Sequence, residues 1–392
     1  MTDSKYLMFT ERYRERLRHR ESTGLLRTPP LIDSREGKYL LSGGRRLLNF
    51  SANDYLGLGA SASLRQQVAH NFQKYGTSAS SSRLVSGNFS TIARTEAAYA
   101  RHFGYEAALF FPSGYQANFG LLSTLFEKGD LLFFDKHLHA SSIKGMTLSG
   151  ASFRGYNHND LSHLRKRLDG EQTELKAVLT ESLFSMDGDQ LDIGEFGKLK
   201  DAYGFFSVID EAHAFGAMGS QGRGIARPVA DIAIGTFGKA LGLFGAFALM
   251  PMVIKEYLFN YCSPLIYSTT LPEAHAASAL DVLEAIAADE SARASLKEIS
   301  SLMKKALLAE GLKVRGEAHI ISWEIGEERE TVKMAQELLA RGIFVFTARY
   351  PTVPQGRAML RLGMSALHGP EDIASFITAV REIKGQEGVM NG

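Results

Sequence analysis

Lys239 lies in a glycine-rich segment, GTFGKALGLFG, at the end of the short apolar run DIAIG. Gly238 and Gly242 leave room for a second backbone or a ligand to come close. A lysine amine in a partly desolvated pocket has a lowered pKa and can form a Schiff base with an aldehyde such as pyridoxal 5′-phosphate (PLP). Thr236, three residues earlier, could offer a hydroxyl to the phosphate of that aldehyde. An isolated lysine is more often a solvated surface charge, so the prediction depends on other residues.

A second apolar run, FFSVID, ends at Asp210, and the motif DEAH continues to His213. DEAH also occurs in nucleotide hydrolases, but the sequence has no GxxxxGK[ST] phosphate loop to accompany it. In a PLP enzyme, an aspartate that keeps the pyridine nitrogen protonated makes the ring an electron sink. Asp210 fits that role, and His213 could reach the ring oxygen. A capping aspartate beside a core histidine is the alternative explanation of the motif.

Two further runs are followed by residues that could hold a flat, phosphorylated ring. In FFPSGYQANFG, Ser113, Gly114 and Tyr115 precede a predicted helix that begins near Gln116. Free amide groups at a helix N-terminus, together with a serine hydroxyl, form a cradle for a phosphate. His139 follows LLFFD in DKHLHASS, and its ring could stack on a heteroaromatic cofactor. Each signal is weak alone, because Ser-Gly turns are common and single histidines are usually structural.

The segment LTESLFSMDGD places Glu181 and Ser185 after a further run, and we predict that both contact the cofactor. Asp187 and Asp189 could be taken for metal ligands. No further carboxylate or histidine spacing supports calcium or zinc, so the segment predicts a turn and we predict no metal.

Arg361 lies in an otherwise apolar run, MLRLGMSALHG. A guanidinium in a buried strand needs an anionic partner. A substrate carboxylate, held by two parallel hydrogen bonds, is one candidate. An internal aspartate or glutamate is the other.

The elements that must position these residues follow from the pattern of apolar runs. Between about residues 90 and 250, the runs ALFFPSG, DLLFFDKH, ASFRGY, KAVLTES, FFSVIDE, DIAIGTFGK and GAFALM alternate with helical stretches. Continuous apolar runs with intervening helices predict a mainly parallel α/β sheet covered on both faces. Ligands bind beyond the carboxyl ends of the strands in such a sheet, which is where the residues above lie.

With 392 residues, the chain is too long for one ordinary core. We predict an N-terminal helix and arm over residues 1–50, containing the hairpin GKYLLSGGRRLLNF. A large domain follows over residues 51–280, and a smaller C-terminal α+β domain over residues 281–392. In the smaller domain, strands at HIISWEIG and GIFVFTARY flank the helix ETVKMAQELLARG.

Composition limits the partners and the setting. The formal net charge of +1 gives no pull toward nucleic acid, and no run of about 18 apolar residues predicts a membrane span. The single cysteine, Cys262, excludes an internal disulfide framework and is compatible with a reducing compartment, so we expect a cytoplasmic protein. Arginines 12 to 20 interleave with glutamates, which favours a solvated amphipathic helix over a binding patch.

Taken together, these segments resemble the α-oxoamine synthase family, which are PLP enzymes of the fold-type I aminotransferase class. The resemblance spans nearly the whole chain. It runs through NFSANDYLGLG, SRLVSGN, PSGYQANFG, HLHASS, TESLFSMDGD, DEAHAFGAMGSQGRG, GTFGKALG, YSTTLP, PTVPQG and LRLGMSALHGPEDI. Among the branches of the family, SRLVSGN and the stretch from DEAHAFG to GTFGKALG are most similar to the 8-amino-7-oxononanoate synthases, which use alanine in the biotin pathway.

The resemblance implies a homodimer with a shared active site and a role for each predicted residue. It implies the Schiff base at Lys239, the pyridine-nitrogen contact at Asp210, ring-oxygen contacts at His213 and Ser185, stacking by His139, and phosphate contacts at Gly114, Tyr115 and Thr236 with Ser268 and Thr269 of the partner subunit. It also implies that Asn53 and Arg361 hold the amino-acid carboxylate, and that Arg27 lies at the entrance for the acyl chain.

The chemistry implied by the resemblance is a decarboxylating condensation. A small amino acid, with alanine expected, attacks the thioester of an acyl-CoA or an acyl carrier protein and gives an α-amino ketone. The glycine C-acetyltransferase, serine palmitoyltransferase and autoinducer synthase branches stay open as alternatives. So do an aminotransferase on the same fold and a non-catalytic protein that has kept the fold.

Overall fold

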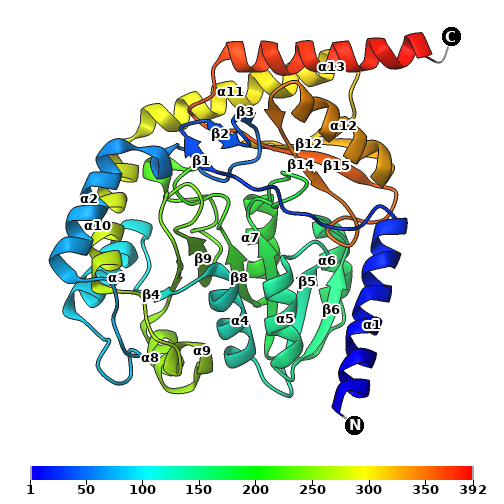
Figure 1. Ribbon diagram of the computed structural model, residues 1–392. Helices are drawn as coiled ribbons and strands as arrows, with labels where there is room; N and C mark the ends of the chain where they lie inside the picture. Colours follow the sequence, from blue (N-terminus) through cyan, green and yellow to red (C-terminus); the bar gives the residue numbers. More distant parts are fainter. Residues whose placement is uncertain (1, 391–392) are drawn as a thin grey trace.

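The computed structural model describes residues 2–390, and a seven-stranded sheet forms its centre (Figure 1). The strand order is β4-β10-β9-β8-β7-β5-β6, and only β10 runs antiparallel to its neighbours. The predicted mainly parallel sheet is therefore confirmed. The strands are β4 (Ala107–Phe111), β5 (Leu131–Asp135), β6 (Ser152–Tyr156), β7 (Lys176–Glu181), β8 (Phe206–Asp210), β9 (Ile232–Thr236) and β10 (Ala246–Met250).

Helices cover both faces of this sheet, which is why its strands are apolar at consecutive positions. Phe110 packs into one hydrophobic cluster, whereas its neighbours Leu109 and Phe111 pack into a second cluster on the other face. The helices of this region are α2 (Ala62–Tyr75), α3 (Ser90–Phe103), α4 (Gly114–Leu125), α5 (Ala140–Leu148), α6 (Leu161–Leu168), α7 (Ile193–Tyr203), α8 (Met252–Tyr261), α9 (Ser263–Ile266) and α10 (Glu273–Ala288), with short 3-10 turns at Leu58–Ala60 and Ser220–Gly222.

A smaller sheet follows in the chain and packs with three helices above the first (Figure 1). Its strand order is β11-β12-β15-β14. These elements are β11 (Val314–Arg315), β12 (Ile320–Gly326), β14 (Phe346–Ala348), β15 (Ala358–Gly363), α11 (Glu290–Ala309), α12 (Glu328–Ala340) and α13 (Pro370–Met390).

The predicted N-terminal hairpin is present as β2 (Tyr39–Ser42) and β3 (Arg45–Asn49), with β1 (Ser34–Glu36) beside it. Gly43 and Gly44 both have positive φ, as a two-residue hairpin turn requires. The prediction of one strand through GIFVFTARY is wrong. The chain divides there into β13 (Ile343–Phe344), which pairs with β3, and β14, which pairs with β15, because this stretch joins two different sheets. The predicted division at residues 50 and 280 stays a prediction.

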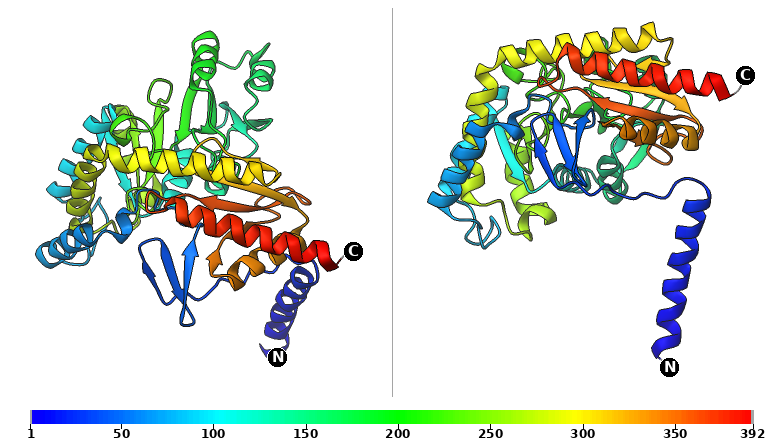
Figure 2. Two further views of the ribbon diagram at one scale, coloured as in Figure 1. Left: turned by 90° about the horizontal axis from the view of Figure 1, so that it is seen from above. Right: turned by 45° about the horizontal axis from the view of Figure 1, so that its top comes forward.

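The N-terminal helix α1 (Thr2–Ser22) extends away from the rest of the molecule (Figure 2). Its larger apolar side chains, from Tyr6 to Leu17, are mostly exposed. Within residues 2–390, no helix is long and apolar enough to cross a membrane.

Candidate active site

Three predicted residues meet at the carboxyl edge of the central sheet. Lys239 follows β9, and its Nζ lies 2.8 Å from Nε2 of His213, which follows β8. Asp210 is the last residue of β8. Because β8 and β9 are parallel neighbours, the residues after both strands lie at the same edge of the sheet. The structure therefore brings Lys239, His213 and Asp210 together, as the sequence predicts.

Asp210 is held in place by two hydrogen bonds to its carboxylate. Its Oδ2 accepts a bond of 2.8 Å from Nδ2 of Asn118, and its Oδ1 accepts the backbone N–H of Ala212 at 2.9 Å. Asn118 is buried on α4 and was not predicted from the sequence. It follows Gly114 by four residues, one helical turn, so it lies on the same face of α4 as the predicted cradle. That spacing was the signal that could have identified it.

Burial sets the electrostatics around the lysine. Desolvation lowers the pKa of Lys239 to about 8, although the negative charges of Asp210 and Glu181 oppose the shift. Glu181 ends β7 and is 2% exposed, and burial together with the charge of Asp210 raises its pKa. A lysine amine is nucleophilic only when it is neutral, so a pKa of about 8 makes a useful fraction of Lys239 reactive near neutral pH.

The N-terminus of α4 has the properties of the predicted phosphate cradle. Ser113 is the N-cap of this helix, and its hydroxyl accepts the N–H of Gln116 at 3.2 Å. The N–H groups in the first turn of a helix have no helical acceptors and point outward. A Cβ on Gly114 would meet only Thr236, at 4.0 Å, so the space beyond the helix end is open. Tyr115, the second residue of the helix, is half exposed at the same end.

His139 lies at the same edge, where it is the N-cap of α5. Its Nδ1 lies 2.7 Å from the hydroxyl of Ser141, and its backbone N–H donates to Glu181 at 2.8 Å. Desolvation and the nearby charge of Lys239 lower the pKa of His139. A neutral imidazole that is fixed at one nitrogen suits the predicted stacking role.

Arg361 lies on β15 of the smaller sheet and reaches the same region from the opposite side. It is 4% exposed, its Nε donates to the backbone carbonyl of Ser185 at 3.1 Å, and its Nη2 donates to the hydroxyl of Tyr55 at 3.1 Å. No carboxylate within the described part of the chain forms an ion pair with this guanidinium. The alternative of an internal acidic partner therefore has no support, and a buried cation is left to attract a substrate anion.

Tyr55 is the main residue of the site that sequence reasoning missed. It is completely buried, and its hydroxyl lies 2.6 Å from Nδ1 of His213 and 3.1 Å from Oδ1 of Asn53. Together with the bond from Arg361, these contacts join the substrate side of the site to the lysine side. His319, whose ring centre lies 4.0 Å from that of Tyr55, packs behind this junction. The motif NDYLGLG contained Tyr55, but only its asparagine had been assigned.

Arg27 lies outside this cluster and lines a neighbouring groove. Its guanidinium donates to the hydroxyl of Thr352 at 3.1 Å. The groove has a volume of about 570 Å³ and is mostly apolar, with Arg349 as a second cation. Its apolar lining and two arginines suit an apolar chain with an anionic end. The predicted contact of Arg27 with an acyl chain stays a prediction.

Ser268 and Thr269 lie between α9 and α10, where Thr269 pairs with Ser82 in an isolated bridge. The structure describes one chain, so their predicted action across a subunit interface stays a prediction. The remaining donor set fits PLP: an amine for the aldehyde, a fixed carboxylate for the ring nitrogen and an open helix end for the phosphate.

Comparisons with known proteins show the family to which the chain belongs. A family model described as aminotransferase class I and II matches residues 45–380. An 8-amino-7-oxononanoate synthase from Trichlorobacter lovleyi is 38% identical over 386 residues, which cover 96% of this chain and 98% of that protein. The corresponding protein of Chlorobaculum parvum is 37% identical over 95% of this chain and 98% of its own length.

Solved structures show the same fold. A serine palmitoyltransferase from S. paucimobilis with bound PLP has a TM-score of 0.90 at 25% identity and covers 98% of this chain and 99% of that chain. An 8-amino-7-oxononanoate synthase from Francisella tularensis has a TM-score of 0.75 at 29% identity, covering 87% of this chain and 99% of its own. These matches confirm the predicted fold type I and PLP as the predicted cofactor. The chain thus belongs to the aminotransferase class I and II family of PLP-dependent enzymes.

Proposed function

We propose that this enzyme condenses alanine with an acyl thioester, with loss of carbon dioxide and the thiol, to give 8-amino-7-oxononanoate. The observation that carries the proposal is the similarity, at 35% to 38% identity over nearly the whole chain, to relatives named 8-amino-7-oxononanoate synthase. The enzyme would then act in biotin synthesis, and we expect it in the cytoplasm.

The product name constrains the two substrates. Alanine without its carboxyl group supplies carbons 8 and 9 of the product, together with the amine. Carbons 1 to 7 then come from an acyl thioester that carries a second carboxylate at its far end. The groove beside Arg27 and Arg349 offers apolar walls for such a chain and two cations for its carboxylate. Either coenzyme A or an acyl carrier protein could present the thioester.

On the amino-acid side, the residues that bind and orient are Arg361 and Asn53. Arg361 is buried and has no acidic partner among the described residues, so it can hold the carboxylate of the amino acid. The hydrogen bonds of Tyr55 to Arg361 and Asn53 keep both side chains in one arrangement. Fixing the carboxylate in this way orients the Cα–H bond, and orientation of the reacting groups accounts for much of an enzyme's rate.

Lys239 is the residue that moves the proton. Its pKa of about 8 lies close to neutral pH, where an amine can both accept a proton from Cα and return it. His213, at 2.8 Å from Nζ, is buried, and desolvation keeps its pKa well below the ordinary value, so it stays neutral beside the lysine. PLP, when it is bound, supplies the electron sink that stabilises negative charge on Cα.

A homodimer is the proposed assembly, with Ser268 and Thr269 of the partner subunit completing the phosphate site. Exposed apolar side chains near this segment, Tyr267 at 82% and Val85 at 78%, support burial against another surface. We expect sedimentation of the holoenzyme to give a dimer.

A thiol-release screen tests the proposed function. The holoenzyme is mixed with alanine, glycine or serine, each against short, long and terminally carboxylated acyl-CoA, and free thiol is measured. We expect release with alanine and a carboxylated chain, and no release when either substrate is left out. Release with serine and a long chain instead would move the enzyme to the serine palmitoyltransferase branch, which the TM-score of 0.90 makes the main alternative. Amino-group transfer to the cofactor by an amino acid alone would indicate an aminotransferase.

A further inference from the structure

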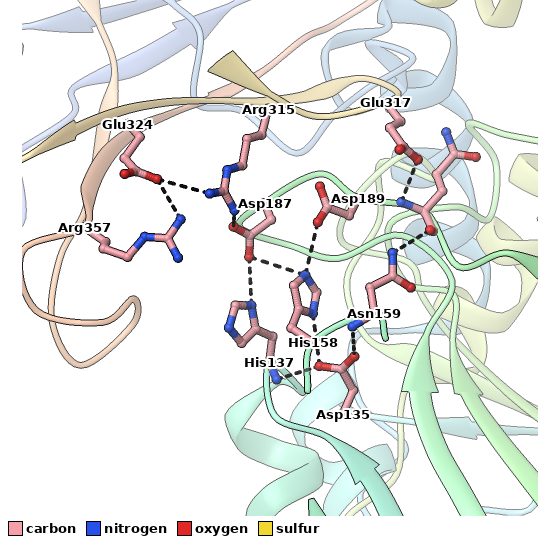
Figure 3. Close-up of polar contacts among 11 residues, drawn as sticks. Asp135, His137, His158, Asn159, Asp187, Asp189, Arg315, Glu317, Glu324 and Arg357 are labelled. Carbon is pink, nitrogen blue, oxygen red and sulfur yellow. Dashed lines mark hydrogen bonds and ion pairs between the residues drawn. The ribbon is translucent and has the colours of Figure 1, made fainter. Parts of the chain in front are cut away.

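A polar cluster lies beside the active site and joins segments that are far apart in the sequence (Figure 3). At its centre, His158 follows β6, and both of its ring nitrogens face carboxylates. Nδ1 lies 3.0 Å from Oδ1 of Asp135, at the end of β5, and Nε2 lies 3.2 Å from Oδ2 of Asp189. Oδ2 of Asp187 lies 3.7 Å from the same Nε2. An imidazole placed between carboxylates on both sides is best satisfied when it carries two protons and a positive charge.

Two of these carboxylates, Asp187 and Asp189, belong to a turn that reaches the active site, residues 183–190, which we call the DGD turn. The turn is closed by bonds of 3.0 Å from the N–H of Phe184 to the carbonyl of Asp189 and from the N–H of Gly188 to the carbonyl of Phe184. Because the turn is closed, Ser185 cannot move independently of Asp187 and Asp189. Ser185 in turn accepts the Nε–H of Arg361 on its backbone oxygen.

The DGD turn also packs against the smaller sheet. Contacts with both the smaller and the central sheet therefore fix its position. A Cβ on Gly188 would lie 2.2 Å from the carbonyl oxygen of Ile320, and the N–H of Glu317 donates to the carbonyl of Gly188 at 2.9 Å. Arg315 of β11 lies 3.9 Å from Asp187. On the side of the central sheet, the turn has ionic contacts with His137, which lies 2.9 Å from Asp187, and with His158, which links Asp189 to Asp135.

We infer that His158 is a positioning residue which, as a cation between Asp135 and the DGD turn, fixes Ser185 and thereby aims Arg361 at the carboxylate of the amino acid. This inference rests on the proposed function only for the identity of the amino acid. His158 does not touch the substrate or the cofactor in this scheme, and its effect passes through the backbone of the turn.

A metal ion is the competing explanation, since His137, His158 and Asp187 could offer ligand atoms within 4.8 Å of one another. The two imidazole rings stack with centres 3.9 Å apart and planes 13° from parallel. The lone pairs of stacked rings lie in parallel planes and do not converge on one ion. The Nδ1 of His137 already lies 2.9 Å from Asp187, and the geometry favours a protonated His158 over a shared metal.

The test is the binding of the amino acid to holoenzyme that carries His158→Asn. Asparagine cannot become a cation, so the three carboxylates repel one another and the DGD turn shifts. We expect the dissociation constant for L-alanine to rise about 10-fold, because charge-assisted hydrogen bonds that hold the turn are lost. The change in cofactor absorbance when L-alanine alone is added measures this constant. The kcat should change less than about two-fold, because Lys239 contacts His213 rather than the turn.

Two further variants separate positioning from general damage. His137→Asn is the matched control, because the His137 side chain stacks on His158 and contacts Asp187. The bond of His137 to Asp135 comes from the backbone N–H, at 2.7 Å, and the variant keeps that bond. We expect it to leave L-alanine binding within about two-fold of wild type. Asp189→Asn added to His158→Asn removes one of the crowded charges and should restore part of the lost affinity.

Equal loss in His137→Asn and His158→Asn, or a fall in kcat without loss of amino-acid binding, would overturn the inference. If His158→Asn does not fold, Asp189→Asn alone tests the same contact from the more exposed side, and unchanged L-alanine binding in that variant overturns it as well. Failure of the proposed function is distinguishable, because wild-type enzyme would then release no thiol with alanine and a carboxylated acyl-CoA, although the binding measurement could still be made with glycine or L-serine.

The last part of the experiment is a titration of the wild-type holoenzyme with Zn²⁺, in which calorimetry measures binding. Binding that His137→Asn and His158→Asn both abolish would favour the metal explanation and overturn the charge argument. If Zn²⁺ does not bind, or if its binding survives in both variants, the result supports the role of His158 as a cation.

Discussion

The two sides of the active site are built in different ways. The lysine side consists of residues at the ends of β7 and β8 and shortly after β9, so adjacent strands of one sheet hold Glu181, Asp210 and Lys239. The substrate side consists of Arg361 from the smaller sheet, Tyr55 from an N-terminal loop and Ser185 from the DGD turn. Three segments far apart in the sequence must therefore fold together before the carboxylate site exists.

The two sides should therefore respond differently to substitutions. A sheet that is covered on both faces fixes its strand ends whatever the neighbouring loops do. The substrate side depends on hydrogen bonds between loops, among them the contacts of Tyr55 and His158. We therefore expect substitutions on the lysine side to abolish the chemistry, and substitutions on the substrate side to weaken amino-acid binding while the cofactor stays in place.

Lys239→Ala should have the largest effect. The variant lacks the amine that is placed to join the cofactor and to move the proton, so turnover should fall at least about 10³-fold. The visible absorption band that the cofactor shows when it is attached to the lysine should disappear as well. Absorbance spectra and thiol release measure the two effects. A retained band would show that Lys239 is not the residue to which the cofactor is attached.

Arg361→Lys should have the next largest effect and should separate the two sides. The lysine keeps the charge but loses the planar fork that donates to both Ser185 and Tyr55. We expect the KM for the amino acid to rise about 30-fold, from the loss of charge-assisted bonds worth about 2 kcal/mol. The absorbance of bound cofactor should stay unchanged. A large loss of cofactor in this variant would show that the two sides are not independent.

Tyr55→Phe should have a smaller effect of the same kind. The ring still fills its buried space, but the hydroxyl that joins Arg361, His213 and Asn53 is gone. Removal of one buried hydroxyl with charged or polar partners costs about 1–1.5 kcal/mol, so kcat/KM for the amino acid should fall about 10-fold. Steady-state kinetics with the acyl thioester at saturation measures the change. An unchanged kcat/KM would show that the hydroxyl does not connect the two sides.

The smallest expected effect is a pH-dependent contribution of His158 to stability. Burial opposes its charge, but the hydrogen bonds to Asp135 and Asp189 outweigh burial and raise its pKa to about 9. A histidine whose pKa is raised in the folded state stabilises it fully below the unfolded pKa of about 6.5, and this stabilisation is lost as the pH rises through about 9.

Thermal unfolding of wild type and His158→Asn between pH 6 and 9.5 measures this contribution. We expect a difference in Tm of about 2 °C at the acid end, which shrinks as the pH approaches 9. A difference that stays constant with pH would mean that His158 contributes packing alone.

The lysine side was largely predictable because its signals are local. Each residue directly follows an apolar run, and parallel strands bring their carboxyl ends to one edge, so Lys239, Asp210 and His213 could be grouped before any contact was known. The same kind of pattern predicted a helix N-terminus after FFPSG, although the helix begins at Gly114 rather than near Gln116. The split of GIFVFTARY into β13 and β14 was not predictable, because an apolar run does not show which sheet each of its residues joins.

The sequence by itself determined the strand pattern, the edge at which ligands bind and the residue types needed for PLP chemistry, because periodicity and strand ends are local properties of the chain. Only the tertiary structure decided that Arg361 has no acidic partner within residues 2–390, that Tyr55 joins it to His213, and that His158 lies between the carboxylates of Asp135 and the DGD turn. These contacts join residues from separate segments of the chain, and such pairings arise from the packing of those segments rather than from any pattern along one of them.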